Sequence, residues 1–111
     1  LFRSHKEIVI ERKNSLEELS GNLVKGRERF EKEFLKARNN GCSIHLMVEN
    51  PQGLNDIMKH NYNTQLKPTS YMASLKSFEQ RYDLKMQFID PQYSGYNIYS
   101  TFYYYMRNKL H

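Results

Sequence analysis

Three short apolar runs, set far apart along the chain, constrain the fold of this protein more than any other feature of its sequence. Residues 7–13, 43–49 and 84–90 are rich in β-branched and other apolar side chains. Such runs are typical of strands in a buried sheet. The long segments between them repeat apolar residues at three- and four-residue steps, which predicts amphipathic helices. Strands that alternate with helices predict a largely parallel sheet and therefore an α/β fold.

The positions of the helices follow from the apolar spacing and from turn-forming residues. Gly21 and Gly26 are expected to divide the first helical region into a short helix, a turn and a longer helix, and Asn39-Asn40-Gly41 is expected to terminate it. The first of these regions is 14–41, expected to be mostly helical. The other expected helical segments are 54–60, 69–82 just after Pro68, and 94–110.

Composition limits the classes of protein that the chain can belong to. At 111 residues the chain is expected to form a single domain, 1–111. Its composition, with 39% hydrophobic and 26% charged residues, excludes a disordered or membrane-embedded chain. We therefore expect no membrane partner. The net charge of +5 favours an anionic partner, of which nucleic acid is the commonest. A single cysteine, Cys42, cannot form an internal disulfide and suits a reducing cytoplasm.

The first apolar run ends in the charged triplet Glu11-Arg12-Lys13. Side chains alternate between the faces of a strand, so Glu11 and Lys13 point one way while Arg12 points the other, where it is expected to brace the fold or pair with an acid. A carboxylate binds Mg²⁺ through oxygen, and a lysine can orient a water and stabilise phosphate charge. The pair therefore suits metal-assisted phosphodiester hydrolysis, with a structural ion pair at a strand edge as the alternative.

The residues around the triplet resemble the nuclease domain of the XPF/Mus-type (ERCC4-domain) structure-specific endonucleases, most closely their small phage and prophage relatives. The similarity covers about residues 8–50. It consists of the triplet Glu11-Arg12-Lys13, the turn Leu19-Ser20-Gly21, the arginine-containing helix start Gly26–Phe30, and the strand that ends in Glu49.

This resemblance implies a restriction-endonuclease-like three-layer sandwich with a mostly parallel central sheet. It also implies a Mg²⁺- or Mn²⁺-dependent endonuclease acting on branched or flapped DNA in the cytoplasm of a bacterial or phage-infected cell. The implied site residues are Glu11, Lys13 and Glu17 for catalysis, Glu11, Glu17 and Glu49 for the metal, and Arg12, Lys25, Arg27 and Arg29 for DNA.

Two departures from the family pattern bear on these implications. Glu17 stands where the family usually has Asp, and Glu18 beside it is a second candidate for that role. The family also carries a Gly-Asp pair on an earlier strand, whereas this sequence has no acid before Glu7. Either that first strand lies outside the sequence, or the chain lacks this metal ligand.

The segment 94–110 carries an aromatic stripe that allows two further interpretations. Tyr99, Phe102, Tyr103 and Met106 are the expected face of a homodimer, because tyrosine combines apolar area with a polar tip. Stacking of these rings on DNA bases is the alternative. A non-catalytic DNA-binding module or a dimerisation module of the same fold therefore remain alternatives to the enzyme. The four histidines lack ligand spacing, so no zinc site is expected, and His45 is expected to be packed or half-buried.

Overall fold

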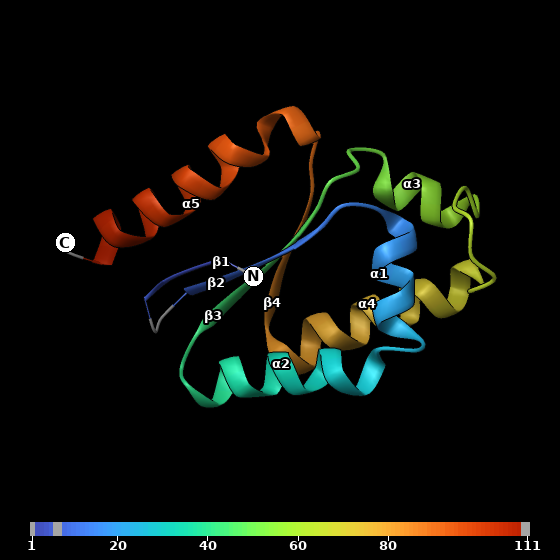
Figure 1. Ribbon diagram of the computed structural model, residues 1–111, viewed down its shortest axis with the longest axis horizontal. Coiled ribbons are helices and arrows are strands. Elements are labelled where there is room, and N and C mark those ends of the chain that lie inside the picture. The colour runs from blue at the N-terminus through green and yellow to red at the C-terminus, as the bar shows by residue number, and fades with distance from the viewer. Residues whose placement is uncertain (1, 6–7, 110–111) are drawn as a thin grey trace.

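The computed structural model, which describes residues 2–5 and 8–109, is an α/β sandwich around a four-stranded sheet (Figure 1). The strands are β1 (Phe2–His5), β2 (Ile8–Lys13), β3 (Ser43–Val48) and β4 (Leu84–Phe88), in the spatial order β1-β2-β3-β4. β2, β3 and β4 are parallel, which confirms the expected parallel sheet, and β1 pairs antiparallel with β2 at the edge. The sequence analysis missed β1, whose four residues FRSH include a single apolar side chain.

The helices lie close to their expected positions. They are α1 (Leu16–Leu23), α2 (Arg27–Asn39), α3 (Gly53–Met58), α4 (Pro68–Tyr82), the 3-10 helix η1 (Pro91–Tyr93) and α5 (Ser94–Lys109). The break between α1 and α2 covers residues 24–26 and so includes Gly26, as expected, whereas Gly21 lies inside α1. Pro68 is inside α4 instead of before it, because proline is well tolerated in a first helical turn. The expected ends at Glu7 and Leu110 lie outside the described residues.

Helices cover both faces of the sheet (Figure 1). α1, α2 and α4 pack on the face to which Val9, Ile44 and Leu46 point, and these side chains are at most 3% exposed. A cluster of aromatic rings from α2 and α4 completes this core, namely Phe30, Phe34, Phe78 and Tyr82. α5 lies over the other face, to which Ile8 points. In the described part of the chain, no helix combines the length and apolar character needed to cross a membrane.

A close packing contact at the start of α3 gives a prediction about stability. A Cβ added to Gly53 would lie 2.1 Å from Cδ1 and 2.9 Å from Cγ of Phe88. Because Cγ is the root of the ring, a ring rotation cannot relieve the overlap, and Gly53→Ala should lower the free energy of unfolding by about 1–3 kcal/mol. Urea denaturation followed by circular dichroism measures this change.

Gly21→Ala is the matched control for that substitution. Gly21 lies within α1, and a Cβ there would meet no atom within 4 Å. Alanine is favoured over glycine in a helix, so this variant should gain about 0.5–1 kcal/mol. Equal gains in both variants would contradict the packing of Phe88 on Gly53.

Candidate functional site

Glu11 and Lys13 form a buried ion pair at the carboxyl end of β2. Both side chains point from the sheet toward α1 and α2, as their alternation predicted, and Lys13 Nζ lies 3.0 Å from Glu11 Oε1. The two residues are only 7% and 8% exposed, and Lys13 Nζ also lies 5.1 Å from the centre of the Phe30 ring. Burying two charges costs more than burying apolar side chains of similar size. A buried ion pair is therefore weak evidence for a stabilising role.

The pair opens onto a polar cavity of about 260 Å³ between β2 and the turn that joins α1 to α2. The side chains that line this cavity with the pair come from α1 and α2. They are Asn22, Arg29, Phe30 and Glu33, beside the backbone of Gly26. Arg29 is highly exposed at the rim, where its Nε lies 4.0 Å from Glu33 Oε1. The cavity thus combines two carboxylates with an ammonium, a guanidinium and an amide.

Asn22 contributes an unusual group to this cavity. Its Oδ1 atom is buried, and it has no hydrogen-bond partner within the described residues. Leaving a buried oxygen unsatisfied costs about 1–3 kcal/mol, so such an atom is expected to bind a water or a cation. The sequence analysis missed Asn22. Its spacing of three residues from Leu19 did place it beside the apolar face of α1, which is the one signal that could have found it.

Glu49 lies on the opposite face of the sheet from Glu11. Its carboxylate accepts hydrogen bonds from Arg12, with Nε at 2.7 Å and Nη2 at 3.2 Å, and a further short hydrogen bond from Ser94 Oγ of α5. The prediction that Arg12 pairs with an acid on that face is confirmed. The structure does not bring Glu49 to Glu11, because the register of β3 against β2 directs its side chain toward α5. Arg12, a candidate for binding DNA, is instead half-exposed beside Glu49.

The Arg12–Glu49 pair predicts a stability change in acid. The hydrogen bond from Arg12, with a smaller one from Ser94, holds the pKa of Glu49 below 4.5 although burial opposes the shift. Because the folded pKa is below the unfolded one, the stabilisation is complete above about pH 4.5 and is lost as pH falls through the folded pKa. Glu49→Gln should therefore make the unfolding free energy less dependent on pH below 4.5.

Urea unfolding at a series of pH values between about 6 and 3 measures this dependence. The comparison is between Glu49→Gln and the unmodified chain under identical salt. Parallel losses of stability in the two proteins would contradict a role for the Glu49 carboxylate.

The neighbouring acids Glu17 and Glu18 hold local structure. Glu17 Oε2 accepts a hydrogen bond from the backbone N–H of Asn63 at 2.8 Å. Glu18 Oε1 accepts one from the Asn14 N–H, and the Glu18 N–H donates to Ser15 Oγ, so Ser15 caps α1. Neither lines the cavity, so the structure does not bring Glu17 to Glu11. Across residues 8–109, no group of three His, Cys, Asp or Glu side chains is arranged to hold a metal ion.

The three basic residues at the start of α2 have different surroundings. Arg27 Nη1 donates to Ser74 Oγ at 3.3 Å, and its guanidinium lies over the Phe78 ring, so Arg27 packs α2 against α4. Lys25 is exposed in the turn before α2, away from the cavity lining. Of the three, Arg29 is the one at the cavity.

The structure also shows where the aromatic residues of α5, Cys42 and His45 lie. On α5, Tyr99 and Tyr103 are 65% and 45% exposed and stack at 5.9 Å, while Phe102 and Met106 are partly buried. A dimer through these residues stays a prediction. Cys42 is buried. His45 is half-buried, as expected, and burial, followed by the charge of Lys85, lowers the pKa of His45.

No protein-family model, curated protein or solved structure matches this chain. The expected resemblance to the XPF/Mus-type nucleases therefore depends on the motifs of residues 8–50 alone.

Proposed function

We propose that the chain is a hydrolase that cleaves phosphodiester bonds with a divalent cation. Within that class, we propose a DNA endonuclease domain of the XPF/Mus type with a restriction-endonuclease-like core. The observation that carries the proposal is that the buried Glu11–Lys13 pair lines a polar cavity. An ion pair sealed in the core would be structural, whereas a pair at a cavity can meet a ligand.

The donor atoms of the cavity fit a hard cation such as Mg²⁺ or Mn²⁺. Glu11 and Asn22 both line the cavity, and the Oδ1 atom of Asn22 is a buried, unsatisfied oxygen donor. Mg²⁺ in phosphate-processing sites commonly takes one or two carboxylates and completes its shell with water and phosphate oxygens. Glu11 and Asn22 would hold the ion, which when bound polarises the phosphate and acidifies a bound water.

Lys13 supplies the positive charge of the chain's own catalytic machinery. Its ammonium donates toward Glu11 and has two further protons, which can bind the attacking water or a non-bridging phosphate oxygen. The negative charge that develops on the phosphate is then stabilised by a group that is already oriented. The Phe30 ring limits the movement of the ammonium and excludes water from one side of it.

DNA is the substrate that fits the surroundings of the cavity. The exposed guanidinium of Arg29 stands at the rim, and the chain has a net charge of +5, which attracts a polyanion. The choice of branched or flapped DNA is supported by the resemblance of residues 8–50 to the nuclease family.

A non-catalytic DNA-binding or dimerisation module is the second candidate. One observation favours it: the expected additional metal ligands do not line the cavity. Glu17 instead accepts a hydrogen bond from Asn63, and Glu49 accepts one from Arg12. Cation affinity then depends on Glu11, Asn22 and the more exposed Glu33 at the rim.

Cleavage and cation binding, measured side by side, separate the two candidates. Labelled flap, fork and linear duplex DNA are incubated with Mn²⁺, Mg²⁺ or EDTA, and Mn²⁺ binding is titrated by calorimetry. We expect cleavage that requires the cation, and Asn22→Leu should weaken Mn²⁺ binding by about fivefold to a hundredfold, the range seen when a group that supports a metal site is lost. Salt-sensitive DNA binding without cleavage would favour the second candidate, and absence of both would refute the nuclease.

A further inference from the structure

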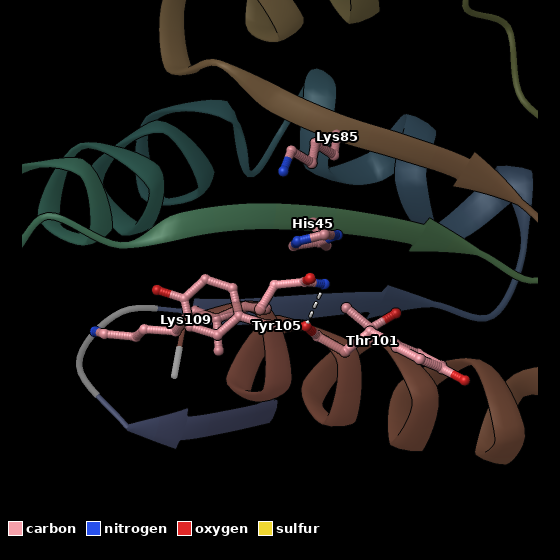
Figure 2. A pocket seen from close by; sticks show the side chains of 8 residues that line it. His45, Lys85, Thr101, Tyr105 and Lys109 are labelled. Atoms are coloured by element: carbon pink, nitrogen blue, oxygen red, sulfur yellow. Dashed lines mark hydrogen bonds between the residues drawn. The ribbon is translucent and has the colours of Figure 1, made fainter. Parts of the chain in front are cut away.

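A groove separates the second half of α5 from the sheet. Helix α5 is joined to the strands near its start, where Asn97 Nδ2 donates to Gln87 Oε1 at 2.8 Å. Beyond that point an open groove of about 610 Å³ lies between α5 and the strands. Its chemistry is set by His45 of β3, Lys85 of β4, and Thr101, Tyr104, Tyr105 and Lys109 of α5 (Figure 2).

Among the described residues that line this groove, the ionisable groups that bear charge near neutral pH are basic. Figure 2 shows His45 and Lys85 on the strands, with Tyr105 and Lys109 across from them on α5. The described lining residues include no acid, and Lys85 forms no ion pair within the described chain. Lys109 Nζ lies 5.9 Å from the centre of the Tyr105 ring. The groove therefore favours an anionic occupant.

Aromatic rings line the same groove. Tyr104 lines the groove and is 52% exposed, and its ring meets that of Tyr103 edge-on at 4.9 Å. Tyr103 in turn stacks on Tyr99, so exposed rings continue along α5. Basic groups that bind phosphates, next to aromatic faces on which bases stack, are the usual components of a site for single-stranded nucleic acid.

We propose that this groove binds a short segment of single-stranded nucleic acid, with Lys85 on a phosphate and Tyr104 stacked on a base. The volume is in the range that holds a ligand of one or two nucleotides, and it is too small to admit a duplex. The site goes beyond the proposed hydrolysis, because it lies on the opposite face of the sheet from Glu11 and Lys13. A second copy of the chain is a poorer occupant, since each copy carries a net charge of +5.

Binding of a labelled oligothymidylate of about eight nucleotides tests this proposal, because stretches of that length match single-strand sites. Fluorescence anisotropy is measured in EDTA, so that cleavage is excluded and failure of the nuclease proposal has no effect on the result. Lys85→Glu should raise the Kd by about tenfold and flatten its salt dependence. Tyr104→Ala should raise the Kd by about fivefold or more through lost stacking.

Lys36→Glu is the matched control, since Lys36 is exposed on α2 and carries the same charge change on the other side of the sheet. It should alter the Kd by less than about twofold. NMR signals of the His45 ring should shift as the oligonucleotide is added. Equal losses from Lys85→Glu and Lys36→Glu, no binding of the single strand, or tighter binding of a duplex would each overturn the proposal. A dimer by light scattering that Lys85→Glu dissociates would place a second copy in the groove and would overturn it as well.

Discussion

Glu11→Gln should lower the rate of cation-dependent DNA cleavage by about 10²–10³-fold, the range seen when one preorganised electrostatic group is removed from an active site. Glutamine preserves the shape of the side chain but lacks the carboxylate charge that pairs with the Lys13 ammonium and that would hold the proposed cation. Lys13→Ala should have an effect of similar size, because it removes the positive charge at 3.0 Å from that carboxylate. The measurement is single-turnover cleavage of flap DNA with saturating Mn²⁺.

The two substitutions should not be additive. Because the proposed mechanism has Glu11 and Lys13 act on one phosphate as a unit, the double variant should cleave about as slowly as either single variant. Glu28→Gln makes the same chemical change at an exposed position on α2 and should leave the rate within about twofold. DNA binding retained in all variants would exclude loss of folding as the cause. Full activity in Glu11→Gln would refute the assignment of the cavity as the active site.

Lys13→Met should destabilise the fold by about 3 kcal/mol, the low end of the range for breaking a buried ion pair. The substitution keeps most of the volume beside Phe30 but leaves the Glu11 carboxylate buried without its ammonium. The low end applies because the adjoining cavity can admit water to the carboxylate. Urea denaturation at neutral pH measures the loss.

The double variant Glu11→Gln with Lys13→Met should recover most of that stability. Removing both charges also removes their desolvation cost, so a neutral pair is often as stable as the ion pair that it replaces. This result, together with the expected loss of cleavage, would show that the pair serves chemistry and not stability. A double variant as unstable as Lys13→Met alone would contradict that conclusion.

Several features of the fold followed from local sequence. The β-branched run Ile8–Ile10 and the helical spacing around it predicted parallel strands joined by helices, because burial on both faces of a sheet needs such runs. Alternation along one strand also separated Arg12 from Glu11 and Lys13, since neighbouring side chains in a strand leave on opposite faces. These predictions depend on the geometry of one segment at a time.

Other features required contacts between distant segments. The face on which Glu49 lies depends on how β3 is aligned with β2, where Lys13 pairs with Val48, and no local pattern encodes that alignment. Asn22 became a candidate ligand because the packing of α1 and α2 buries its Oδ1 atom without a partner and places the residue in the same cavity lining as Glu11. Strand β1 is short and polar, and its pairing with β2 defines it.

The sequence alone therefore determined the order of strands and helices and the shared face of Glu11 and Lys13, because the periods of strand and helix are local properties of the backbone. Tertiary structure decided which other groups meet that pair: it brought Asn22, Arg29 and Glu33 to the cavity and held Glu17 and Glu49 elsewhere. It also formed the basic groove under α5 from strands and a helix far apart in the chain. The physical reason is that a site is assembled by packing between segments, and local periodicity carries no information about which segments pack together.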